Sequence, residues 1–354
     1  MTFEEARSLF PVLERVAYLN AGTFGPLARH TAEALGAELR SETARGRFGK
    51  EYFERMLALR GDVRAALAGL VGVEPGQVAL TSSTTDGCNI VLAGLELTGD
   101  DEVVTTADEH FGLLGPLHAS GARIVVVPPE PDAILGAVTP RTRLLALSHV
   151  LWTTGRLLPV HELRERTEIP ILVDGAQSVG AIPVDARGLD FLTISGQKWL
   201  CGPDSTGALV VADPVRLRVA RPSYFSQASY EPSGRFEPRE GAARFDANWL
   251  APSALAGLVS ALALPPDWRF ARAAAQARLC RGLLSAHVDV VPGDATLISF
   301  HADDPPALVT RLAERDVVVR DLPGTGLVRV SCGWWTNDDD LDRLAAGVKT
   351  GVTV

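Results

Sequence analysis

Residues 169–211 read IPILVDGAQSVGAIPVDARGLDFLTISGQKWLCGPDSTGALVV, and this stretch decides the fold. Three short apolar runs within it are typical of strands buried in the sheet of an α/β protein; they lie at 171–173, 191–194 and 207–211. The first run stops at Asp174, and the second is followed by the turn SGQK, which ends in Lys198. Ligands bind at the carboxyl ends of such strands, so we expect Asp174 and Lys198 to face one crevice.

An acid and a lysine at successive strand ends meet the chemical needs of pyridoxal 5'-phosphate (PLP). A carboxylate keeps the pyridine nitrogen of this cofactor protonated, which makes it an electron sink, while a lysine carries the cofactor and moves the substrate Cα proton. Taken singly, Asp174 is equally well explained as a turn residue and Lys198 as a solvated surface lysine. The surrounding pattern favours the cofactor.

That pattern comprises DGAQSVGAIPVD at 174–185, SGQKW at 195–199 and GPDSTG at 202–207, and it resembles class V aminotransferase-like enzymes of PLP fold type I. The resemblance implies an α/β fold with a mainly parallel, seven-stranded sheet and a small C-terminal α+β domain. It further implies that Asp174 pairs with the pyridine nitrogen, Gln177 contacts the ring hydroxyl and Lys198 carries PLP. The domains expected are an N-terminal segment of the small domain (1–20), the large PLP-binding domain (21–252) and the small domain (253–354).

The residues just before the lysine contain a departure from the family. Ser195 and Gln197 belong to the expected cofactor shell, but the family usually has His where Gln197 stands, donating a hydrogen bond to the phosphate. A glutamine amide can also donate. We therefore predict that cofactor binding is retained.

Length and composition indicate an ordinary globular protein. The 354 residues, 46% hydrophobic and 22% charged, suffice for a large domain and a smaller one. A net charge of −9 argues against nucleic acid or anionic membrane as partners. No signal-peptide core or membrane-spanning run is present. The four cysteines show no CxxC spacing, which predicts a reduced, cytoplasmic protein with neither a disulfide framework nor a metal site.

A binding site for a phosphate group, the phosphate seat, is predicted directly after the apolar run at 78–80. The hydroxyl-rich segment TSSTTDG at 81–87 leads into an expected helix at 88–95, and a helix N-terminus favours a dianion. An ordinary N-cap is the alternative for this segment taken alone. With Asp174 and Lys198 nearby in the fold we prefer the phosphate, and the resemblance places its contacts at Thr84 and Thr85.

His110 follows a predicted strand at 102–105, within the sequence DEHF. A single histidine is often structural, but class V enzymes stack a histidine from this position on the cofactor ring, where it can also carry a proton. Phe111 is the alternative stacking residue.

Four further features acquire meaning from the resemblance. The loop at 18–27 is either a plain connection or a substrate contact. Trp152 stands where many cysteine desulfurases have an asparagine that contacts substrate and cofactor, so the site here is more apolar. Arg244 lies in a loop that reaches the partner subunit's active site in this class, unless it is a plain surface arginine. Long predicted helices at 29–45 and 52–71 suit a homodimer.

Arg329 lies in the predicted strand VRVS, where fold type I enzymes bind the substrate α-carboxylate with a bidentate guanidinium. Arg320 ends the preceding predicted strand, at 317–320. Two arginines on adjacent strands could hold two carboxylates or hold one very firmly. A salt bridge at the rim is the alternative for Arg320.

The segment between these arginines separates branches of the class. Cysteine desulfurases carry a nucleophilic cysteine on a mobile loop there, but 320–329 contains none, so sulfur would leave directly by elimination. Five segments spread over nearly the whole chain resemble the cyanobacterial cystine C–S lyase branch; they are TTDGCNIVLAG at 84–94, DEHFGLLGPL at 108–117, SHVLWTTGRLLP at 148–159, RFD with LAGL at 244–246 and 255–258, and VVRDLPGTGLVRVSCGWWTNDDD at 318–340.

This branch implies cleavage of a small amino-acid substrate, L-cystine or a related cysteine derivative, to pyruvate, ammonia and a persulfide or thiol. Lys198 would take the Cα proton, the arginines would bind carboxylates and His110 would stack on the cofactor. An aminotransferase or an amino-acid epimerase of the isopenicillin N epimerase type is the alternative. A binding or regulatory module without activity is disfavoured by the intact Lys198, Asp174 and Arg329.

Overall fold

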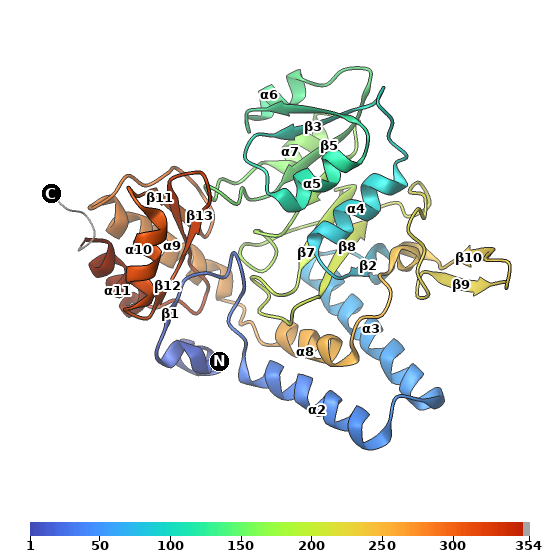
Figure 1. The fold of residues 1–354 in the computed structure, drawn as a ribbon, viewed down its shortest axis with the longest axis horizontal. Helices are drawn as coiled ribbons and strands as arrows, with labels where there is room; N and C mark the ends of the chain where they lie inside the picture. The colour runs from blue at the N-terminus through green and yellow to red at the C-terminus, as the bar shows by residue number, and fades with distance from the viewer. Residues whose placement is uncertain (350–354) are drawn as a thin grey trace.

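The computed structural model describes residues 1–349, and a seven-stranded sheet forms its centre (Figure 1). The strand order is β2-β8-β7-β6-β5-β3-β4. Every pairing is parallel except that β8 runs antiparallel to β2 and β7, which confirms the predicted mainly parallel sheet. The strands are β2 (Val78–Thr81), β3 (Glu102–Thr106), β4 (Arg123–Val127), β5 (Thr142–Ser148), β6 (Ile171–Asp174), β7 (Phe191–Ser195) and β8 (Gly207–Val211).

Successive side chains along the central strands point to opposite faces of the sheet and form two hydrophobic cores, one on each face. In β5, Leu145 and Leu147 face one core, whereas Leu144 and Ala146 face the other, as the two-residue period of a strand requires. The first core is covered by α3 (Gly49–Val71), α6 (Pro131–Gly136), α7 (Val160–Glu165) and α8 (Pro252–Ala263). The second is covered by α4 (Thr84–Gly94) and α5 (Phe111–Ala119).

The C-terminal part has its own sheet and core. Its antiparallel strands are ordered β11 (Leu297–His301), β14 (Leu327–Ser331) and β13 (Arg320–Leu322). Around them lie α9 (Arg269–Ser285), α10 (Pro305–Ala313) and α11 (Asp338–Lys349). The N-terminal strand β1 (Ala17–Tyr18) pairs in parallel with β12 (Val317–Val318), which brings Ala17 and Leu19 into this core.

The structure corrects several expected boundaries. The strand expected at 317–320 is divided, because β12 pairs with β1 while β13 begins at Arg320 and pairs with β14. Segment 3–13 is not one continuous helix: α1 (Phe3–Ser8) is followed by a 3₁₀ turn at Pro11–Glu14, since the residue before a proline disfavours the helical conformation. In the proline-containing segment between β4 and β5, α6 begins at Pro131, a favourable first helical position.

Two longer segments frame the large sheet. The helix α2 (Arg29–Arg45) packs along α8 and is joined to α3 by a short turn. The segment at 212–239 contains an antiparallel hairpin, β9 (Gln227–Tyr230) with β10 (Phe236–Pro238), which stands out from the body (Figure 1). Short 3₁₀ turns lie at Pro75–Gln77 (η2) and Gly241–Phe245 (η3). Within residues 1–349 no helix combines the length and apolarity needed to cross a membrane.

Candidate active site

A cavity of about 190 Å³ opens where β5, β6 and β7 end, beside the start of α4. Its wall contains all the residues predicted to bind the cofactor, together with Trp152; these are Thr84, Thr85, His110, Asp174, Gln177, Ser195, Gln197 and Lys198. The sheet thus brings together residues that are far apart in the sequence.

Asp174 and Lys198 lie at the ends of adjacent parallel strands, as expected. The Asp174 side chain is buried, and its Oδ1 accepts hydrogen bonds from the Ala176 N–H (2.8 Å) and the Thr193 hydroxyl (3.3 Å). Burial lowers the pKa of Lys198 to about 8, with Arg329 and Arg320 acting in the same direction and Asp174 opposing them. A lysine with this pKa is partly neutral, and therefore nucleophilic, near pH 8.

The two glutamine amides of the site are oriented by their neighbours. Gln177 Nε2 donates to the Gly22 carbonyl (2.9 Å) and its Oε1 accepts from the Trp199 indole (2.9 Å), which leaves one amide N–H for a ligand. The Ser195 hydroxyl donates to Gln197 Oε1 (2.8 Å), so the Gln197 NH₂ group is turned towards other acceptors.

The loop at 18–27 packs against residues of the cavity wall, although none of its own residues lines the cavity. The Gly25 N–H donates to the Gln197 carbonyl (2.8 Å). A Cβ atom on Gly25 would lie 2.1 Å from the Lys198 carbonyl oxygen, and one on Gly22 would lie 2.8 Å from Arg329 Nη2. A side chain at 25 would collide with the backbone, so this position requires glycine, whereas one at 22 would displace the Arg329 guanidinium.

The expected phosphate seat lies at the N-terminus of α4, which begins at Thr84 and not at residue 88 as predicted. Ser83, which the sequence did not single out, caps the helix by accepting the Asp86 N–H (3.1 Å) and also lines the cavity. Thr84 and Thr85 occupy the first helical positions, where backbone N–H groups have no acceptor within the helix. These N–H groups are suited to a dianion.

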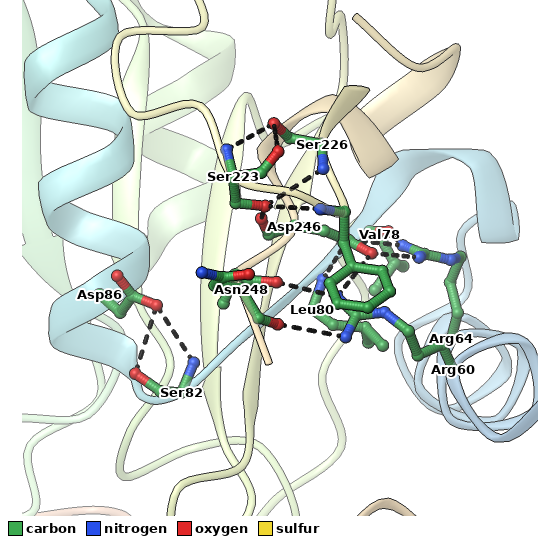
Figure 2. A network of polar contacts seen from close by, with 12 residues as sticks. Arg60, Arg64, Val78, Leu80, Ser82, Asp86, Ser223, Ser226, Asp246 and Asn248 are labelled. Atoms are coloured by element: carbon green, nitrogen blue, oxygen red, sulfur yellow. Dashed lines mark hydrogen bonds and ion pairs between the residues drawn. The ribbon is translucent and has the colours of Figure 1, made fainter. Parts of the chain in front are cut away.

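A buried ion-pair network centred on Asp246 lies beside the strand that leads into this turn (Figure 2). Asp246, 3% exposed, accepts from Arg60 Nη2 (3.2 Å), Arg64 Nη2 (2.8 Å) and the Leu80 N–H (2.9 Å). The network therefore fixes the end of β2, which leads into the phosphate seat. Sequence reasoning missed Asp246. In the same loop the Arg244 guanidinium donates to carbonyls of its own chain, those of Arg239 and Gly241 (both 3.2 Å).

His110 caps α5, and its Nδ1 accepts the Gly112 N–H (3.0 Å), so the proton of the neutral ring lies on Nε2. Desolvation lowers the pKa of His110, and Lys198 lowers it further, which keeps the ring neutral. The ring meets Trp152 edge-on at 5.0 Å between centroids. Phe111, the alternative stacking residue, is 78% exposed and is not in the cavity wall.

Arg320 and Arg329 are direct cross-strand partners on β13 and β14. Arg329 is 1% exposed, and its Nη1 donates to the Trp152 carbonyl (3.1 Å). The Thr23 hydroxyl lies between the two guanidinium groups, 3.3 Å from Arg329 Nη2 and 3.2 Å from Arg320 Nη1. Burial and the neighbouring Arg320 lower the pKa of Arg329 to about 9. Among the ion pairs of residues 1–349 none involves either arginine, so this pair is suited to an anion from outside.

One further buried acid, Glu109, lies behind the cavity and was not predicted. Its carboxylate accepts from the Thr106 hydroxyl (2.8 Å), the Ser148 N–H (2.9 Å) and the Ser148 hydroxyl (2.5 Å). Burial raises the pKa of Glu109 to about 7.

The cavity fits PLP group by group. Asp174 would meet the pyridine nitrogen, Gln177 the ring hydroxyl, and the N-terminus of α4 with Gln197 the phosphate, while Lys198 would hold the aldehyde carbon. These complementary groups surround one cavity. When bound, PLP supplies an electron sink for a carbanion at the substrate Cα. The fold and site therefore define a PLP enzyme of fold type I.

Comparison with known proteins places the chain more narrowly. A model of the aminotransferase class-V family matches residues 20–310. Isopenicillin N epimerase of Amycolatopsis lactamdurans is 31% identical, with 94% of each chain covered. The Streptomyces clavuligerus enzyme of that name is 32% identical over 67% of this chain, and the chain spans only 63% of its length.

Among solved structures, two of the protein C-DES superpose with a TM-score of 0.90. One is a lysine-to-alanine mutant with glycine covalently linked to the PLP cofactor (27% identical, 98% and 99% of the chains covered). The other is this cystine C–S lyase with its product cysteine persulfide (28% identical, 97% and 100% covered). The chain belongs to the aminotransferase class-V family, and it is a PLP-dependent protein.

Proposed function

We propose that this protein is a PLP-dependent C–S lyase that carries out β-elimination on L-cystine or a related cysteine derivative. The products would be pyruvate, ammonia and a persulfide or thiol. The observation that carries the proposal is the pair Arg320 and Arg329, joined through Thr23 beside the cofactor cavity. Two guanidinium groups suit a substrate with two carboxylates, and cystine is such a substrate.

The roles of the residues follow from their positions. Arg329 would bind the α-carboxylate and so orient the Cα–H bond. The Lys198 amine, whose pKa burial lowers to about 8, would accept the Cα proton. The C–S bond then breaks with its electrons on sulfur, and the Nε2–H of the neutral His110 ring would donate a hydrogen bond to the departing sulfur anion, which takes its proton from solvent. The three-carbon enamine that is released hydrolyses to pyruvate and ammonia.

The cysteines support direct elimination over transfer of sulfur to the protein. All four, Cys88, Cys201, Cys280 and Cys332, are buried. Burial raises the pKa of Cys88 and Cys201, so these thiols are poor nucleophiles. The segment between Arg320 and Arg329 carries none.

We also propose a cytoplasmic homodimer. Tyr224, Tyr230 and Trp249 are 46%, 62% and 59% exposed and form one aromatic cluster. Trp249 also lines a cavity of about 350 Å³ that reaches Ser82 below the phosphate seat. A second copy covering this face would bring the loop of Arg244 close to the partner's active site. Light scattering on the purified protein measures the mass, and a monomer at micromolar concentration would contradict the dimer.

The division into residues 1–20, 21–252 and 253–354 is likewise proposed. The separate cores of the two parts and the pairing of β1 with β12 support it, although Leu255 and Leu258 of α8 pack into the core of the large sheet. The helix α8 connects the parts, since it packs on α2 and precedes α9.

The test of the activity is an assay of the PLP-loaded protein with L-cystine, following pyruvate. Pyruvate formed without any added 2-oxo acid, and lost in Lys198→Ala, supports the lyase. An epimerase is the second candidate, favoured by the isopenicillin N epimerases at 31% and 32% identity. Exchange of the substrate Cα proton with deuterated solvent and inversion at Cα, with no pyruvate, would favour it and refute the lyase.

A further inference from the structure

The backbone pairing between β3 and β5 stops before the ends of the two strands. Beyond that point, side-chain hydrogen bonds link them. Backbone pairing runs only from Glu102 with Thr142 to Val104 with Leu145. Beyond that point the Thr105 hydroxyl donates to the Ala146 carbonyl (2.7 Å). At the last residue of β5, the Glu109 carboxylate accepts both the N–H (2.9 Å) and the hydroxyl (2.5 Å) of Ser148. Glu109 thus supplies the acceptor that the ladder no longer offers.

Hydrogen bonds hold this carboxylate in place without a cation. Glu109 is 4% exposed, and no ion pair within residues 1–349 includes it. Its third hydrogen bond comes from the Thr106 hydroxyl (2.8 Å), so one side chain bridges the ends of β3 and β5. A buried carboxylate is tolerated only when such bonds satisfy it.

The two loops that this bridge joins carry residues of the site. His110 is the next residue in the chain, and it lines the cavity as the N-cap of α5. Ser148 also lines the cavity and is the register partner of Asp174 on β6. Any shift of the Glu109 carboxylate would therefore move His110 relative to Asp174.

We propose that Glu109 is a positioning residue. Through its hydrogen bonds to Ser148 it holds the turn that carries His110 against the end of β5, and so sets the distance between His110 and Asp174 across the cofactor cavity. The proposal rests on the cofactor site described above, and it does not depend on which reaction the site performs. A small residue at 109 would leave the buried Ser148 N–H without its acceptor and free the turn.

Three variants test this role. Glu109→Ala removes all three bonds. Glu109→Gln keeps an oxygen for Thr106 and the Ser148 N–H, and its NH₂ group can donate to the Ser148 hydroxyl. The matched control is Glu102→Ala, at the opposite end of β3. Glu102 is also buried, at 2% exposure, and is held by Thr139 (2.6 Å) and Arg141 (2.7 Å).

The readouts are the PLP dissociation constant and the visible circular dichroism of the bound cofactor, which reports the orientation of its ring. We expect Glu109→Ala to weaken PLP about tenfold, equivalent to about 1.4 kcal/mol, and to diminish the dichroic band. Glu109→Gln should restore both to within about twofold. Glu102→Ala should melt earlier than the wild type but keep both values, because stability alone does not set the ring orientation.

A folded Glu109→Ala protein with wild-type affinity and dichroism would overturn the proposal. So would equal losses in Glu102→Ala. If Glu109→Ala does not fold, Thr106→Val removes a single bond, and a smaller loss in both readouts is expected. No change in either readout of that variant would overturn the proposal as well. None of these measurements requires turnover, so a failure to make pyruvate from L-cystine would refute the proposed activity and leave this test intact.

Discussion

Replacement of Asp246 by alanine tests whether the network beside the phosphate seat stabilises the protein. The change removes the only carboxylate that the ion pairs of residues 1–349 give to Arg60 and Arg64, and it leaves the buried Leu80 N–H without its 2.9 Å acceptor. Breaking a buried ion pair from one side costs about 3–5 kcal/mol. With an unfolding entropy of about 2.1 cal/mol/K per residue, a chain of 354 residues would lose about 4–7 °C in Tm.

Asp246→Asn separates charge from hydrogen-bond acceptance. Oδ2 faces both guanidinium groups, at 3.2 Å from Arg60 and 2.8 Å from Arg64, while Oδ1 accepts the Leu80 N–H. An amide would satisfy Leu80 only by turning its NH₂ group towards two cations. We therefore expect asparagine to be nearly as destabilising as alanine.

The assay is thermal unfolding of the apoprotein, followed by the PLP dissociation constant of each variant at a temperature where it is folded. Asp185→Ala is the matched surface control. Its ion pair with Arg187 joins side chains that are 45% and 73% exposed, so the expected cost is about 0–1 kcal/mol. If Asp246→Ala melts no earlier than Asp185→Ala, the reasoning about the buried network is wrong. Unchanged PLP affinity would refute its link to the phosphate seat.

Three further predictions concern the cavity. Attachment of PLP to the apoprotein requires neutral Lys198, whose pKa burial lowers to about 8. The attachment rate measured by stopped flow should therefore rise about tenfold per pH unit below pH 8 and level off above it. A rise that continues to pH 10 would contradict this. Arg320→Ala should raise KM at least about tenfold for L-cystine but little for S-methyl-L-cysteine, which has a single carboxylate. Arg329→Ala should raise KM for both substrates. Equal effects of Arg320→Ala on the two substrates would show that Arg320 does not bind a second carboxylate. Gln197→His should strengthen PLP binding, measured by equilibrium dialysis, and no change in affinity would show that residue 197 does not contact the phosphate.

The cofactor cavity could be predicted because its main residues follow strand ends within one segment. Asp174 and Lys198 are separated by one strand, and parallel strands place their carboxyl ends at one edge. A helix N-terminus following the strand at 78–80 was predicted because the hydroxyl-rich turn marks it locally. The position of its first residue was missed, because the capping role of Ser83 depends on the fold of the turn.

Other contacts have no local pattern in the sequence. Thr23 meets Arg329 across 306 positions, and Asp246 meets Leu80 across 166. In the sequence, Glu109 resembles an ordinary acidic loop residue. Its burial follows from its contacts with Ser148 at the end of β5, which the sequence does not indicate. The strand expected at 317–320 was wrong for the same reason, since the partner of β12 is the N-terminal strand β1.

The loop at 18–27 connects the C-terminal core to the wall of the cofactor cavity. Its base, β1, belongs to the C-terminal core, whereas Gly22 bonds Gln177 and Gly25 bonds Gln197, both in the cavity wall. Thr23, between them, contacts both arginines. One short segment therefore contacts both the arginine pair proposed to bind carboxylate and the two amides of the cavity wall. A change in either region would have to be accommodated by the same few loop residues.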